Sequence, residues 1–172
     1  MKQFLKRKDI VISLQRYGID ALGAMAQGLF ASLLIGTILN TAGTQLGIEA
    51  LVKVGAYASS MSGPAMAVAI GFALQAPPLV LFSLVTVGAA ANELGGAGGP
   101  LSVLIIAIIA AELGKIVSKE TKIDILVTPL VTILSGVGLA SLIAPAIGKA
   151  ASSVVSLCAY HPPWKMVCVF LR

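Results

Sequence analysis

The chain has 172 residues, of which 58% are hydrophobic and 11% are charged, and its mean hydropathy is +0.98. A soluble domain carries about 25% charged residues, so this composition excludes an ordinary soluble globule. The formal net charge is +5, but the basic residues lie in short flanks beside apolar stretches, which argues against nucleic-acid binding. With one histidine and two widely separated cysteines, the chain has no zinc-site spacing, and we expect neither metal nor cofactor.

Four stretches of the chain contain no charged residue, and their lengths suit a membrane. They hold 28, 39, 18 and 24 residues and cover positions 21–48, 54–92, 94–111 and 125–148. About 20 helical residues cross the roughly 30 Å hydrocarbon core of a bilayer, so the longest stretch has room for two crossings. We therefore predict an all-α fold, a polytopic transmembrane helix bundle of about five membrane segments, with four and six as alternatives.

The chain begins with a basic segment, residues 1–18, which we interpret as a cytoplasmic N-terminal helix because it precedes the first apolar stretch. The first span covers 21–39 and should end before Asn40, where the polar run NTAGTQ favours a turn. The second span, 54–75, is predicted to be interrupted at Met61–Pro64, because proline removes a backbone donor and disturbs a helix.

The double proline at 77 and 78 predicts the turn that leads into a third segment at 79–94. The run NELGGAGGP at 92–100 then leads into a fourth segment, 100–117. Two interpretations stay open. The two segments are full spans joined by an exposed glycine loop, or they form a re-entrant hairpin whose irregular tip lies inside the membrane. Irregular backbone at that depth must be buried in protein or line a water-filled cavity.

The last apolar stretch predicts a fifth span at about 125–147, and the transmembrane domain is expected to cover 19–150. Residues 151–172 form an atypical C-terminal tail, which holds both cysteines, the one histidine and the one tryptophan. We interpret the tail as peripheral, with Trp164 at the membrane interface, or as a segment foreign to the fold that follows a lost reading frame.

The distribution of basic residues predicts which ends share a side of the membrane. One basic cluster precedes the first span, and a second one comprises Lys115, Lys119 and Lys122. Basic flanks are typical of cytoplasmic loops, and four spans return the chain to the side from which it started. We therefore predict that both clusters, and the N-terminus, are cytoplasmic.

Small residues recur at helical spacing in three of the predicted spans. Such ladders allow the backbones of neighbouring helices to approach closely in lipid. They predict packing surfaces within this chain or against copies of it, so a homo-oligomer is one expectation. The ladders are Gly28, Ser32 and Gly36; Gly55, Ser59 and Gly63; and Gly136, Ala140, Ala144 and Gly148.

Intramembrane polar groups are the best candidates for a site, because a buried polar group costs several kcal/mol without a partner. Glu93 is the one acid between Lys53 and Glu112, and it follows Asn92 directly. The candidate substrate-binding residues are Asn92, Glu93, Gly95, Gly96, Gly98 and Gly99, where glycines would expose backbone groups to a polar ligand. In the alternative interpretation Glu93 is an exposed loop carboxylate. Glu112 is expected to pair with Lys115 or Lys119.

Three runs of the sequence carry a family resemblance. They are QFLKRKDIVISLQRYGIDALGAMAQGLFASLLIGTILNTAG at 3–43, VGAAANELGGAGGPL at 87–101 and KIVSKETKIDILVTPLVTIL at 115–134. Over about residues 3–150 the chain resembles a bacterial membrane family classed with the subunit IIC (EIIC) proteins of phosphotransferase-system (PTS) sugar transporters. Members of this family look about twice as long, so the chain resembles an N-terminal half with a divergent tail.

The resemblance implies a function and partners. It implies a membrane component of a phosphoenolpyruvate-dependent sugar phosphotransferase system, a multi-pass protein of the bacterial cytoplasmic (inner) membrane. The sugar it translocates would be phosphorylated by cytoplasmic IIA and IIB phosphocarrier subunits, so the phosphoryl chemistry is expected on those partners. The alternatives are a membrane-embedded ligand-binding or sensor protein for a small amphiphile, and a non-functional truncated fragment. The histidine usual in IIC proteins has no counterpart here, since His161 lies in the tail.

Overall fold

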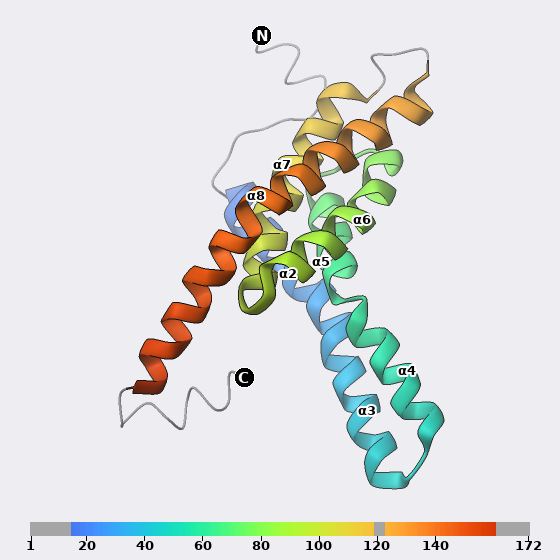
Figure 1. Cartoon of the computed structure of the whole chain (residues 1–172). Helices are drawn as coiled ribbons and strands as arrows, with labels where there is room; N and C mark the ends of the chain where they lie inside the picture. The colour runs from blue at the N-terminus through green and yellow to red at the C-terminus, as the bar shows by residue number, and fades with distance from the viewer. Residues whose placement is uncertain (1–14, 119–122, 161–172) are drawn as a thin grey trace.

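The computed structural model describes residues 15–118 and 123–160, and these residues form helices joined by short turns, with no strand among them (Figure 1). In chain order the elements are η1 (Gln15–Asp20), α2 (Ala21–Leu29), η2 (Phe30–Leu34), α3 (Ile35–Leu46), α4 (Glu49–Ser60), α5 (Ser62–Ala73), α6 (Pro78–Gly95), η3 (Gly96–Gly98), α7 (Gly99–Val117) and α8 (Asp124–Tyr160). Three helical stretches are long and apolar enough to cross a membrane, namely Gln15–Leu46, Pro78–Val117 and Asp124–Val154, and Ser62–Ala73 is a shorter apolar helix. The predicted all-α membrane bundle is confirmed.

The first four elements form one continuous helical rod from Gln15 to Leu46, in which η1 and η2 are π-helical turns. Ser32 lies in η2, and its hydroxyl donates a hydrogen bond to the Gly28 carbonyl (2.7 Å), the kind of back-bond that bends helices. The predicted end of this helix at residue 39 is wrong.

The helix continues through NTAGTQ because the hydroxyls of its threonines donate hydrogen bonds to backbone carbonyls of the same helix. Thr41 donates to the Thr37 carbonyl, and Thr44 donates to the Thr41 carbonyl, both at 2.8 Å. The rod ends at Gly47, which adopts φ +69°, a left-handed conformation that glycine tolerates best.

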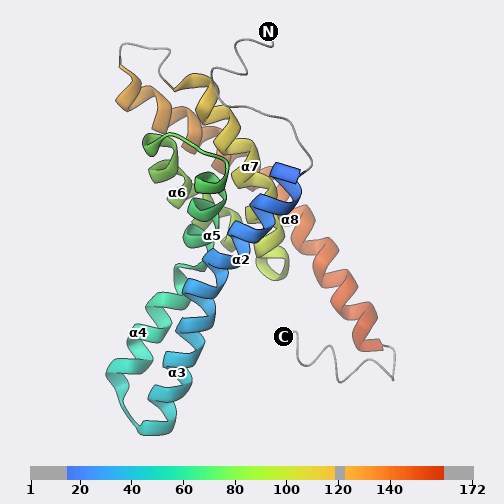
Figure 2. The ribbon, with the colours of Figure 1, turned by 180° about the vertical axis from the view of Figure 1, so that it is seen from behind.

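Helices α4 and α5 return alongside the rod and form an antiparallel hairpin with it (Figures 1 and 2). The predicted ladders are the contact surface, since Gly28, Gly36 and Gly55 are buried. A Cβ on Gly28 would lie 2.6 Å from the Ala65 carbonyl oxygen, and one on Gly55 would lie 2.6 Å from the Asn40 nitrogen. Both separations are far below van der Waals contact, so these positions require glycine.

The predicted interruptions of the next stretch are confirmed. Helix α4 ends at Ser60, and α5 begins at Ser62 after Met61 alone. Helix α5 ends at Ala73, and α6 starts at Pro78, the first position of a helix, where a missing backbone N–H matters least.

The apolar core lies among α5, α6, α7 and α8, which pack on one another. Its side chains are mostly alanine and β-branched or leucine residues at helical spacing, and all of these are buried. Examples are Met66 and Ile70 of α5, Leu84 and Val87 of α6, Ile106 and Ala110 of α7, and Ala140 and Ala144 of α8.

Helix α8 is longer than the predicted fifth span, because it continues past residue 147 to Tyr160. Pro129 and Pro145 lie inside it without ending it. The proposed change of character at 151 therefore does not coincide with a helix end, and the domain boundary at 150 stays a prediction. His161, Trp164 and Cys168 lie outside the described residues, as do residues 1–14 and 119–122.

The ends of the helices that the sequence places on one side of the membrane lie together. The start of the rod and the turn between α5 and α6 lie on the side of the molecule toward which α7 ends and from which α8 starts, and these two helix ends project further (Figures 1 and 2). The α3–α4 turn and the C-terminal end of α8 extend in the opposite direction. This arrangement agrees with the predicted order of crossings, whereas the cytoplasmic identity of the first end stays a prediction.

Candidate functional site

The glycine run forms a tight helical hairpin between α6 and α7. Helix α6 ends at Gly95, and the Gly96 N–H donates to the Glu93 carbonyl. The single 3₁₀ turn η3 follows, and the Gly99 N–H donates to the Gly96 carbonyl as α7 begins. Gly96 has φ +48°, which favours glycine, and no atom lies within 4 Å of the position that its Cβ would occupy.

Two of the glycines in this hairpin pack closely on their surroundings. A Cβ on Gly95 would lie 2.6 Å from the Ser102 hydroxyl, and one on Gly98 would lie 3.0 Å from Ile147 of α8. In return, a Cβ on Gly148 of α8 would lie 2.6 Å from the Gly95 carbonyl oxygen. The tip thus packs against α8 through Gly95 and Gly98, which are buried, whereas Gly96 and Ala97 of the turn are exposed.

Asn92 is half-buried and lies between two other glycines. A Cβ on Gly63, in the first turn of α5, would lie 2.6 Å from the Asn92 Cβ. A Cβ on Gly99 would lie 2.5 Å from Asn92 Oδ1. The break between α4 and α5 and the tip between α6 and α7 therefore meet at this one side chain.

Glu93 is exposed, although it follows Asn92 in the same helix. Neighbouring residues of an α-helix point about 100° apart, so the two side chains face different surroundings. Gly96 and Ala97 are also exposed. The structure thus divides the predicted set into an inner part, Asn92 with Gly95, Gly98 and Gly99, and an outer part, Glu93 with Gly96. A binding role for either part stays a prediction.

The depth of the tip bears on the two interpretations left open by the sequence. Helix α6 has 18 residues and α7 has 19, so each is about 27–29 Å long. The tip lies against Ile147 and Gly148, yet α8 runs on to Tyr160 and the α3–α4 hairpin also extends further (Figures 1 and 2). The α6–α7 hairpin is shorter than its neighbours, but its tip lies beside the predicted end of the fifth span at 147, and each of its helices has about the length of one crossing. Both interpretations therefore stay predictions.

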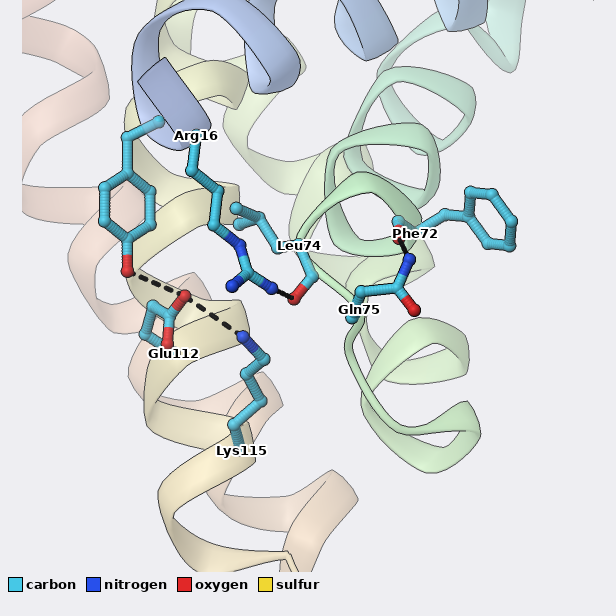
Figure 3. A network of polar contacts seen from close by, with 7 residues as sticks. Arg16, Phe72, Leu74, Gln75, Glu112 and Lys115 are labelled. Carbon is cyan, nitrogen blue, oxygen red and sulfur yellow. Dashed lines mark hydrogen bonds and ion pairs between the residues drawn. The ribbon is translucent and has the colours of Figure 1, made fainter. Parts of the chain in front are cut away.

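A second polar cluster lies at the opposite end of α7 (Figure 3). The Tyr17 hydroxyl of η1 donates to Glu112 Oε1 of α7 at 2.9 Å. The Lys115 ammonium donates to the same oxygen at 3.2 Å, which confirms the expected pair of Glu112 with Lys115. The guanidinium of Arg16 donates to the Leu74 carbonyl in the α5–α6 turn at 2.8 Å.

Burial makes this cluster unusual. Lys115 is 2% exposed, and the Glu112 side chain is 16% exposed. The second carboxylate oxygen of Glu112, Oε2, is buried and has no hydrogen-bond partner among the described residues. Buried charges are rare unless paired, so the Glu112–Lys115 pair compensates two charges that would otherwise destabilise α7.

The sequence indicated one half of this cluster and missed the other. Glu112 and Lys115 are three residues apart in one helix, a spacing that sequence reasoning recognises. Tyr17 lies 95 positions from Glu112, and no local pattern connects them. The one feature of the sequence that could have pointed to this contact is that Tyr17 carries a hydroxyl group just before the first apolar stretch. Within the described residues no group of three or more His, Cys, Asp or Glu side chains could hold a metal ion.

A groove between the rod and α5 is a third feature. It has a volume of about 770 Å³ and is lined mainly by glycine, alanine and larger apolar side chains. Asp20 and Gln27 are its polar members. With so few polar groups, the groove is poorly suited to a hydroxyl-rich ligand.

These features define a polytopic α-helical membrane protein with a glycine-rich hairpin packed against α8. A sequence model of the family described as "Phosphotransferase system, EIIC" matches residues 19–160. Because this match covers most of the chain, the protein belongs to that family. Comparison with curated proteins and with solved structures gave no match.

Proposed function

We infer that this chain is the membrane component of a sugar phosphotransferase system and that it carries the sugar to the cytoplasmic side. The family match over residues 19–160 carries this proposal. In this reading the protein lies in the bacterial inner membrane with its N-terminus in the cytoplasm. Partner IIA and IIB subunits supply the phosphoryl chemistry, so this chain contributes position and a shielded path rather than a catalytic group.

The geometry of the α6–α7 tip supports this proposal. Transporters bind substrates where interrupted helices meet near the middle of the bundle. Here the interruption after Ser60 and the glycine tip meet at Asn92, and the exposed carboxylate of Glu93 lies one residue further along α6. A sugar hydroxyl is a donor that suits a carboxylate, and the side-chain amide of Asn92 offers both a donor and an acceptor. We propose these two residues as the contacts for the sugar.

Uptake into membrane vesicles tests the function. Vesicles containing the full chain and a cytosolic extract with the general phosphotransferase proteins are given a panel of radiolabelled hexoses, pentoses and hexitols. We expect at least one sugar to accumulate in phosphorylated form only when phosphoenolpyruvate is present. Vesicles from cells without the chain provide the background.

The same assay separates the alternative function. A ligand-binding or sensor protein would retain labelled compound without accumulation and without dependence on phosphoenolpyruvate. That outcome, or an absence of any sugar signal above background, would contradict the transport proposal.

A further inference from the structure

The groove between the rod and α5 follows the rod for more than three helical turns. Its lining on the rod runs from Ile19 to Ala31, which is about 18 Å of helix, and its volume is about 770 Å³. Glycine and alanine form much of its surface, and in lipid such residues let the backbone of another helix approach closely. The groove therefore has a length and a surface that suit the packing of a further helix.

Gln27 is a polar side chain of this groove that the chain leaves unsatisfied. It is exposed, and its amide has no hydrogen-bond partner among the described residues. It lies in the uncharged stretch 21–48, about 10 Å along the rod from Asp20, where lipid rather than water surrounds the helix. A free amide is unfavourable there because hydrocarbon offers no hydrogen bond. The amide thus favours an occupant that can hydrogen-bond at this depth, which an acyl chain cannot do.

Gly23 is a second residue of the groove that contacts within one chain do not explain. It is exposed and lacks a positive φ, and no atom lies within 4 Å of the position that its Cβ would occupy. Glycine inside a helix is less favourable than alanine. At Gly28 the Ala65 carbonyl of α5 lies where a Cβ would be, which accounts for that glycine. Close approach by another molecule would account for Gly23 in the same way.

A second copy of the chain fits both residues. Copies inserted in the same orientation are related by a two-fold axis along the membrane normal, which brings Gln27 of one copy opposite Gln27 of the other. An amide carries both a donor and an acceptor, so each Gln27 can donate to the other. Gly23 and Ala31 lie four residues before and after Gln27 and line the same groove, so the two rods can approach closely on either side of the amide pair.

We propose that the chain forms a two-fold dimer in the membrane. The rod of each copy lies in the groove between the rod and α5 of the other copy, and the two Gln27 amides hydrogen-bond across the axis. This proposal goes beyond the sugar-transport function and does not rest on it, because association is measured without any sugar.

Energy transfer between labelled chains tests the dimer. The full chain, labelled at its cysteines with a donor or an acceptor dye, is reconstituted into vesicles of phosphatidylethanolamine and phosphatidylglycerol and then diluted with lipid. We expect transfer that rises linearly with the acceptor fraction, as in a closed pair, and that falls on dilution. Gln27→Leu removes the amide and should raise the apparent dissociation constant about tenfold.

Gly23→Leu tests the same interface independently. Its side chain would fill the groove where the two rods meet, so we expect it to abolish transfer, while the open space around Gly23 lets the single chain fold. Gln45→Leu is the control for the amide, because Gln45 is an exposed residue of the same rod outside the groove. Gly138→Leu is the control for the glycine, because Gly138 is equally open but lies in α8. Both controls should leave the dissociation constant unchanged.

Several results would overturn the proposal. Absence of transfer from the unaltered chain at every dilution would show a monomer whose groove is filled by lipid. A curved dependence on the acceptor fraction would show assemblies larger than a pair. An unchanged dissociation constant for either groove variant, or an equal loss in its control, would place the contact on another face. A failure of sugar uptake by a chain that still pairs would count against transport alone.

Discussion

At the scale of single residues, the sequence identified the chemistry but not the surroundings of each side chain. Glu93 and Asn92 were predicted together because they adjoin in sequence and precede the glycines. The structure turns Asn92 toward Gly63 and Gly99 and leaves Glu93 exposed. Which face of α6 is covered depends on where α5, α7 and α8 pack. Residues near Asn92 in the sequence do not predict that packing.

Replacing Glu93 by Gln tests the predicted site. The amide keeps the shape of the side chain but removes the charge that would accept sugar hydroxyls. We expect phosphoenolpyruvate-dependent uptake to fall at least tenfold, with thermal stability in detergent unchanged because the side chain is exposed.

Glu49→Gln is the matched control for this experiment. Glu49 is also an exposed acid, but it lies at the start of α4, beside the α3–α4 turn. Its replacement should leave uptake unchanged. Uptake by the Glu93→Gln protein equal to that of the unaltered chain would remove Glu93 from the site.

At the scale of elements, periodicity and breakers predicted most of the helices. The interruption at Met61 and the turn before Pro78 follow from proline chemistry, and both were found where expected. The end of the first helix was misplaced by seven residues, from 39 to Leu46, because threonine hydroxyls bond to their own helix and glycines pack on α4. Turn-forming residues can therefore remain helical when their hydroxyls bond within the helix and a single glycine, here Gly43, packs on the neighbouring helix.

Replacing glycine by alanine should have opposite effects at a position packed between the rod and α4 and at an open position in α8. A Cβ on Gly36 would lie 2.8 Å from the Gly55 carbonyl oxygen, so Gly36→Ala should destabilise the protein by about 1–3 kcal/mol. Gly138 lies in α8 with nothing within 4 Å of its Cβ position, and Gly138→Ala should stabilise it by about 0.5–1 kcal/mol.

Thermal unfolding in detergent, with each variant compared with the unaltered chain, measures the difference. Equal melting temperatures for Gly36→Ala and Gly138→Ala would argue that the close packing of Gly36 on α4 does not stabilise the protein.

At the scale of the whole molecule, charge predicted which ends lie together. The start of the rod and the α5–α6 turn lie on the side of the molecule where α7 ends (Figure 1). Most residues of the two basic clusters lie outside the described residues, so their shared side stays a prediction. Nothing in the packing of helices fixes which end faces the cytoplasm, because that side is selected by the basic flanks during insertion.

Cysteine labelling measures the sidedness. After replacing Cys158 and Cys168 by Ser, a single cysteine is introduced at Lys119 or at Gln45, which lie near opposite ends of the predicted crossings. In intact cells a membrane-impermeant maleimide should label Gln45→Cys and spare Lys119→Cys, with both labelled after the membrane is opened. Labelling of both positions from the same side would contradict the predicted topology.

The sequence by itself determined that this chain is a helical membrane protein and where most of its helices break. Those properties depend on composition and on neighbours within a few residues, since solvation by lipid and the loss of a backbone donor are local effects. Only the tertiary structure decided that the glycine tip sits on Gly148, that Asn92 rests between Gly63 and Gly99, and that Tyr17 binds Glu112. These contacts join residues far apart in the chain, and their geometry is set by how closely glycine backbones let the helices approach.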